Sequence, residues 1–151
     1  MSTRFSRLGF AASLLVVAVT AFAGDSTYHR VVDGVAVYFG IMPAEVVRGH
    51  PRWHPEGTMH GGVEVGASHL TVALFQDKSG ERIIDAEVNA RITGERGLDV
   101  RKKLEPMLIA GSRSYGNYFS LSGAGPYRIE ISIRLPRASR TINAEFTWAR
   151  S

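Results

Sequence analysis

The chain contains no cysteine. This absence excludes disulfide bonds, a lipid anchor attached through cysteine and metal sites built from thiolates. No segment has a helical period over three turns, so a helical domain is not expected. Basic side chains are scattered apart from Arg101-Lys102-Lys103, and no basic stripe is interleaved with aromatic residues. Nucleic acid is therefore not an expected partner.

The first 23 residues have the pattern of a cleaved secretory signal peptide. Two arginines precede a short apolar run at residues 8–19, and Ala21-Phe22-Ala23 provides the small-x-small pattern of a cleavage site. The apolar run is shorter than a membrane span requires. We therefore predict export to the periplasm, with residues 1–23 removed and residues 24–151 forming one domain. A retained N-terminal anchor is the alternative.

Three segments alternate apolar and polar residues with a period of two, which is typical of strands with one buried face. They are residues 86–93, 127–135 and 141–148, and the residues predicted to be buried are Val88, Ile92, Ile129, Ile131, Ile133, Leu135, Ile142, Ala144, Phe146 and Trp148. Residues 68–76 are apolar on both faces, as a central strand would be. Because a turn signal follows at residues 77–80, we predict that this strand forms a hairpin with residues 82–93.

Further strands are expected at residues 35–41, 104–110 and 118–121, with turn signals between the segments. About seven short strands in one domain predict an all-β fold. The expected architecture is a single antiparallel β-sandwich, immunoglobulin-like or cupredoxin-like. No internal repeat, low-complexity tract or linker divides the domain.

Most of the histidines are concentrated in one part of the chain. Four of the five fall within twenty residues, and these are His50, His54, His60 and His69. Neutral imidazole is the commonest side-chain ligand of transition metals. The same stretch contains a carboxylate, Glu56, and a thioether, Met59. The cluster predicts a metal site; the alternative is a set of surface histidines in a proline-rich loop.

The spacing of these residues along the chain decides which of them can bind the same ion. His54 and Glu56 are two residues apart, so in an extended strand they share a face with Cα atoms roughly 6.5 Å apart, and both can reach one ion. His60 would lie about 20 Å from His54 along a straight strand. It can join the pair only if the chain bends, for example at Gly57. His69 begins an apolar strand, where a structural role with a hydrogen-bonded ring is the alternative to ligation.

The order of several motifs resembles that of a known family. The motifs are His54-x-Glu56-x-x-x-His60, the apolar strand 70–75, Pro106-Met107, Tyr115-Gly116-Asn117 and Gly-x-Tyr127. This order is similar to that of the periplasmic iron-transport β-sandwich family. The resemblance covers residues 35–148, and it implies a copper-containing site and cooperation with an iron permease of the inner membrane.

The resemblance also implies a set of metal ligands. By position these are His54, Glu56 and Met107. The chain departs from the family pattern, because Ser114 stands where the family has a histidine and no histidine follows His69. The candidate substitutes are His50, His60 and His69. Otherwise the site binds metal differently or has lost that role; a homodimer with a shared site is another way to replace the missing ligands.

These features together predict a non-enzymatic, exported metal-binding protein that acts in metal uptake or homeostasis. The thioether favours Cu(I), imidazole accepts either oxidation state of copper, and a carboxylate adds an oxygen ligand suited to iron or manganese. Ligand imidazoles must be neutral, so the affinity should fall below about pH 6.5. The alternatives are a structural or protein-recognition β-sandwich without metal and, less favoured, an exported copper enzyme.

Overall fold

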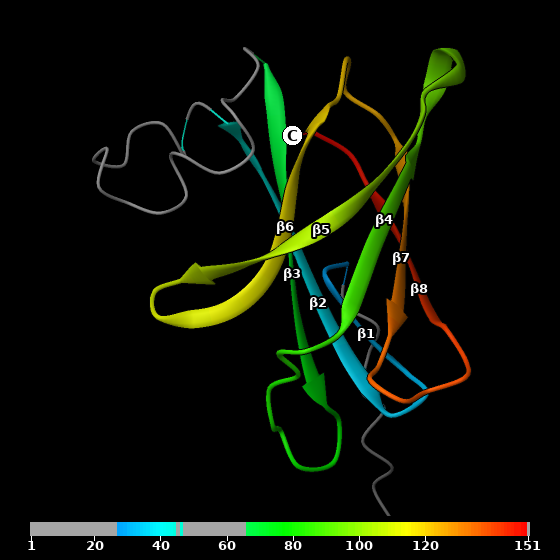
Figure 1. The fold of residues 1–151 in the computed structure, drawn as a ribbon. Helices are drawn as coiled ribbons and strands as arrows, with labels where there is room; N and C mark the ends of the chain where they lie inside the picture. The colour runs from blue at the N-terminus through cyan, green and yellow to red at the C-terminus, as the bar shows by residue number, and fades with distance from the viewer. Residues whose placement is uncertain (1–26, 45, 47–65, 151) are drawn as a thin grey trace, which may run out of the picture.

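The computed structural model describes residues 27–44, 46 and 66–150. Eight strands and one short 3-10 helix are found there, shown in Figure 1. They are β1 (His29–Val32), β2 (Val35–Pro43), β3 (Ala67–Gln76), β4 (Glu87–Thr93), η3 (Glu95–Gly97), β5 (Asp99–Ile109), β6 (Ser112–Ser120), β7 (Tyr127–Arg134) and β8 (Ile142–Trp148). Within those ranges no helix is long and apolar enough to cross a membrane. The signal peptide predicted at residues 1–23 lies outside them.

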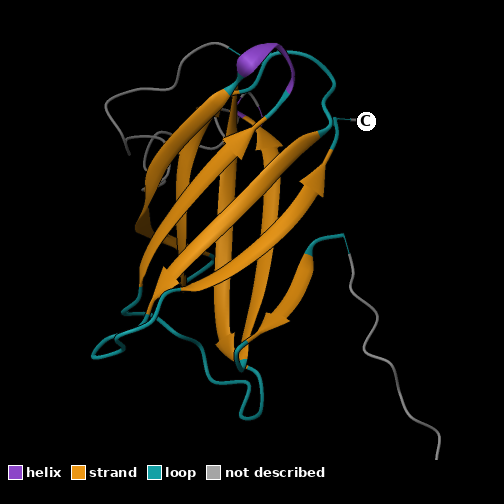
Figure 2. Cartoon of the chain, turned by 90° about the vertical axis from the view of Figure 1, so that its right-hand side faces the viewer, coloured by secondary structure: helices purple, strands orange, loops and turns teal. Residues whose placement is uncertain are grey.

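All the strands belong to one antiparallel sheet. Their order is β1-β2-β3-β6-β5-β4-β7-β8, and β5 joins the two halves by pairing with β4 through residues 99–104 and with β6 through residues 105–109. The sheet curls until its end strands, β1 and β8, come into contact (Figure 2). The antiparallel all-β fold is therefore confirmed. A two-sheet sandwich is not: the described strands number eight and form a nearly closed, barrel-like shape.

The ten residues predicted to be buried line the hydrophobic core. Eight of the ten residues are buried, and the other two, Leu135 and Trp148, pack partly buried against them. Across the core from these strands, β3 contributes Leu70, Val72 and Leu74. Successive side chains of a strand point to opposite faces. His69, Thr71 and Ala73 therefore point away from the core.

The hairpin predicted between residues 68–76 and 82–93 is wrong. β3 pairs with β2 and β6, whereas β4 pairs with β5 and β7, and the two segments share only the isolated bridge between Phe75 and Arg82. The connection crosses to the other half of the sheet and is held there by Tyr115. Its Oη accepts from the Ala86 N–H at 3.0 Å and donates to the Ile83 carbonyl at 3.3 Å. A turn signal shows that the chain reverses, but not which strand it pairs with next.

Strands β5 and β6 are longer than the segments predicted at residues 104–110 and 118–121, and they form a hairpin that was not predicted. Its strands meet at Ala110 and Gly111, whose φ angles of 47° and 77° are both positive. Two such residues are typical of the tight type I′ hairpin turn, which usually contains Asn-Gly or Asp-Gly. Because alanine occupies the first position, the sequence has no Asn-Gly or Asp-Gly signal that would predict this turn. The hairpin places Met107 directly opposite Ser114.

Replacing Tyr115 by phenylalanine should lower the free energy of unfolding by about 1–3 kcal/mol, because the Ala86 N–H and the Ile83 carbonyl each lose a partner. Burial raises the pKa of Tyr115 above its usual value. The unfolded tyrosine ionises near pH 10, so this contribution is complete below that pH and is lost as the pH rises through the raised folded-state pKa.

Urea unfolding at neutral pH and at about pH 11 measures both effects. The stability difference between wild type and Tyr115→Phe should be smaller at the alkaline pH. Tyr28→Phe is the control, since Tyr28 is exposed. Equal stability of wild type and Tyr115→Phe at neutral pH would show that the two hydrogen bonds contribute nothing.

Candidate metal centre

The outer face of β2, β3, β6 and β5 carries two of the predicted metal ligands. On β3, His69 lies opposite Met42 of β2 and opposite Tyr118 of β6. On β5, Met107 lies opposite Ser114 of β6. Residues directly opposite each other in an antiparallel pair share a face. His69 and Met107 therefore lie on one face of the sheet, separated by strand β6.

Gly116 of β6 lies between the two donor side chains. A Cβ atom built on Gly116 would be 2.5 Å from Met107 Sδ and 3.0 Å from His69 Nε2, so the two donor atoms are at most 5.5 Å apart, the sum of these distances. Transition-metal ions bind sulfur at about 2.3 Å and imidazole nitrogen at about 2.0–2.1 Å. With small movements one ion can contact both atoms. The missing side chain of Gly116 leaves the space that both donors face.

Both donors are buried, although they point away from the main core. His69 is 3% exposed and Met107 is 5% exposed. The His69 ring stacks on the Tyr118 ring, with centroids 4.5 Å apart and an interplanar angle of 26°. Neither hydrophobic cluster of the described residues includes Met107. The burial of Met107 is also what a structural β-sandwich without metal predicts, so ligation is argued from the contacts of its sulfur and not from its burial.

The five predicted metal ligands have different outcomes. The structure brings His69 and Met107 together, whereas His54, Glu56 and His60 lie outside the described residues and remain sequence predictions. In the part of the chain that the structure describes, no group of three or more histidine, aspartate or glutamate side chains could hold an ion. A metal site among the described residues therefore requires the thioether of Met107 as a ligand.

Two residues near this pair were missed by the sequence reasoning. Gly116 belongs to the Tyr115-Gly116-Asn117 motif, but its role as a gap between donors follows only from the register of three strands. Glu105 lies directly opposite Gly116. A signal for it was present, because Glu105 and Met107 have the same i, i+2 spacing as His54 and Glu56.

A hollow of about 420 Å³ lies beside the donor pair on the same face. Its lining residues include Gly40, Thr71, Ser114 and Arg82. Thr71 and Ser114 are the cross-strand partners of Gly116 and Met107, respectively. The Arg82 guanidinium donates to the Arg113 carbonyl at 2.8 Å and lies 4.5 Å from the centre of the Phe75 ring. His69, Met107 and Gly116 do not line this hollow, so it is a neighbour of the donor pair and not part of it.

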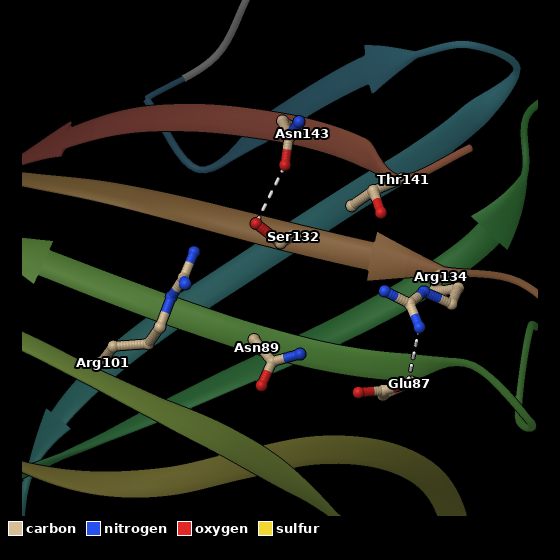
Figure 3. A pocket seen from close by; sticks show the side chains of 7 residues that line it. All are labelled: Glu87, Asn89, Arg101, Ser132, Arg134, Thr141 and Asn143. Carbon is tan, nitrogen blue, oxygen red and sulfur yellow. Dashed lines mark hydrogen bonds and ion pairs between the residues drawn. The ribbon is translucent and has the colours of Figure 1, made fainter. Parts of the chain in front are cut away.

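A second hollow, of about 340 Å³, lies on the outer face of the other half of the sheet (Figure 3). Asn89, Ser132 and Asn143 form a row of short polar side chains across β4, β7 and β8, and Ser132 Oγ donates to Asn143 Oδ1 at 2.9 Å. Longer side chains stand beside this row, among them the ion pair of Glu87 and Arg134 at 3.8 Å. The residues lining it include neither histidine nor methionine, so it is not a candidate for the predicted metal site.

Comparison with solved structures shows that other proteins share this fold. A copper-bound glutamate-to-glutamine variant of FetP from uropathogenic Escherichia coli strain F11 has 12% identity and a TM-score of 0.62, over 81% of this chain and 93% of FetP. Copper-reconstituted P19 from Campylobacter jejuni has 11% identity and a TM-score of 0.62, over 82% of this chain and 92% of P19. A DUF4426 family protein from Pseudomonas aeruginosa PAO1 has 11% identity and a TM-score of 0.63, over 80% and 91%.

These structural neighbours confirm, at the level of the fold, the resemblance found in the sequence. No protein-family model matches the chain, and no curated protein matches it in sequence. At identities of 11–12% the likeness concerns the fold alone. The assignment of a metal centre therefore depends on this chain's own residues.

Proposed function

We propose that this chain is a non-enzymatic periplasmic metal-binding protein that takes copper at a centre containing His69 and Met107. The observation that carries the proposal is the convergence of Met107 Sδ and His69 Nε2 on the space above Gly116. A thioether with an imidazole is a donor set that suits copper, and Cu(I) in particular. The copper-bound forms of FetP and P19 support the choice of metal.

His54, Glu56 and His60 are proposed as additional ligands on the basis of the sequence. The ends of the segment that carries them lie near the donor pair, because Pro43 of β2 lies opposite Ser68, the residue before His69. Each residue of an extended chain spans at most about 3.3–3.6 Å, so the Cα atom of His60 lies within about 32 Å of that of His69. This limit allows His60 to bind the same ion as His69 and Met107.

The physiological role is proposed from the resemblance. It consists of metal uptake or homeostasis, with delivery of iron or copper to an inner-membrane iron permease. Export through the signal peptide at residues 1–23 would place the protein in the compartment that such a role requires. A homodimer that shares the centre is a further part of this proposal.

Metal analysis of protein purified from the periplasm, followed by titration with Cu(I), Cu(II) and Fe(II), tests the proposed function. We expect copper in the purified protein and Cu(I) binding that competes with a chromophoric chelator. Gly116→Ala should weaken Cu(I) binding by at least about tenfold, a typical loss for a disturbed metal site. The added methyl group would lie 2.5 Å from Met107 Sδ and 3.0 Å from both His69 Nε2 and the Leu70 carbonyl oxygen, so it would displace the donor atoms.

Gly40→Ala is the matched control on the same face of the sheet. A Cβ atom there would meet only Thr71 Oγ1, at 3.4 Å. Neither glycine has a positive φ, so alanine can adopt both backbone conformations. Wild-type protein that binds none of the three ions would contradict the proposed function. Equal Cu(I) affinity of Gly116→Ala and wild type would contradict the proposed location of the centre.

A further inference from the structure

We propose that Glu105 is a third ligand of this centre and that its carboxylate extends the range of metals from Cu(I) to Cu(II). This inference rests on the proposed metal-binding function. It assigns a role to a residue that lies outside the histidine cluster and outside the ligand set implied by the family resemblance.

The position of Glu105 follows from the register of β5 and β6. Glu105 lies directly opposite Gly116, and Met107 lies opposite Ser114. Leu104, the residue before Glu105, is 1% exposed and belongs to the core, so Glu105 points to the outer face. Side chains directly opposite each other start about 4.5–5.5 Å apart. The Glu105 side chain therefore begins beside the space that Met107 Sδ and His69 Nε2 already face.

The Glu105 carboxylate has no partner among the described residues. The residue is half-buried. No hydrogen bond or ion pair joins its carboxylate to another residue in the described ranges, whereas glutamates on the other half of the sheet pair with arginines. Lys103 shares a face of β5 with Glu105 but forms no ion pair with it, and Lys102, on the opposite face, donates to the Tyr118 carbonyl at 2.7 Å. A cation above Gly116 would therefore find a carboxylate that has no other partner among the described residues.

The third donor changes what the centre can bind. Methionine sulfur is soft, imidazole is intermediate and a carboxylate oxygen is hard. The sulfur and nitrogen alone favour Cu(I). Adding a negatively charged oxygen stabilises an ion of higher charge, because the Coulomb attraction between carboxylate and metal increases with the charge of the metal. Glu105 should therefore contribute strongly to Cu(II) binding and little to Cu(I) binding.

The test compares Glu105→Gln with wild type and with the control Glu81→Gln. Glutamine has nearly the same shape as glutamate without its charge, and Glu81 is exposed in the turn between β3 and β4. Cu(I) and Cu(II) affinities are measured by competition with chelators of each ion. Glu105→Gln should bind Cu(II) at least about tenfold more weakly and Cu(I) within about threefold of wild type. The electron paramagnetic resonance spectrum of bound Cu(II) should also change, because a neutral amide replaces the anionic carboxylate ligand.

The outcomes separate this inference from the proposed function. If wild-type protein binds Cu(I) and Cu(II), but Glu105→Gln matches Glu81→Gln in Cu(II) affinity and spectrum, Glu105 is not a ligand and the inference is overturned. An equal loss for Cu(I) and Cu(II) would also overturn it, because that result indicates a structural role. If wild type binds neither ion, the proposed function itself fails. Circular dichroism establishes that the variants are folded.

Discussion

We expect the double variant His69→Ala, Met107→Ala to bind Cu(I) at least about 100-fold more weakly than wild type. The two side chains supply the donor atoms that face the space above Gly116. Disturbing only the surroundings of metal ligands typically costs 10–100-fold in affinity, so removing two ligands should reach the upper end of that range or exceed it. A 100-fold loss corresponds to about 2.8 kcal/mol of binding free energy. Competition with a chromophoric Cu(I) chelator measures it.

Both side chains are buried, so the alanine substitutions also leave a cavity. A second pair, His69→Gln and Met107→Leu, largely keeps the volume while removing the imidazole and the thioether. The control is His29→Ala with Leu108→Ala, which removes a histidine from β1 and an exposed side chain next to Met107. If both test pairs bind Cu(I) as tightly as the control, the donors lie elsewhere, and His54 with Glu56 would be the next candidates.

The second large effect concerns stability. Ile131→Ala should lower the free energy of unfolding by about 2–5 kcal/mol, the range for a fully buried isoleucine. Ile131 of β7 has no exposed surface, and its cross-strand neighbours are Ala90 and Ala144. Such short side chains cannot fill the cavity by changing rotamer. The free energy of unfolding of a small domain is about 5–15 kcal/mol, so this loss is a large part of the total stability.

Urea unfolding followed by circular dichroism measures this change. Ile84→Ala is the control, because Ile84 is 46% exposed and should lose about 0.5 kcal/mol or less. Folded Ile131→Ala protein should keep the Cu(I) affinity of wild type, because Ile131 belongs to the half of the sheet that does not carry the donor pair. A loss below about 1 kcal/mol would contradict the assignment of Ile131 to the centre of the core.

Strand character and buried faces could be predicted because both depend on neighbouring residues in the sequence. Alternation with a period of two assigned Ile129, Ile131 and Ile133 to the core, and the structure confirms it. The short half-exposed strand β1 lacked such a pattern and was missed. Strand pairing was harder to predict, as residues 68–76 show: their partners, β2 and β6, are chosen by packing across the whole sheet rather than by the next turn.

The same distinction between sequence and tertiary structure applies to the candidate metal centre. The sequence by itself determined which kinds of donor are present, because imidazole, thioether and carboxylate groups have fixed chemistry wherever they occur. Only the tertiary structure decided that His69 and Met107 meet across Gly116, with Glu105 opposite. These residues come from β3, β5 and β6, and their proximity depends on a register between strands that are distant in sequence. That register is set by the burial of Leu70, Leu104 and the other core residues on the opposite face of the same strands.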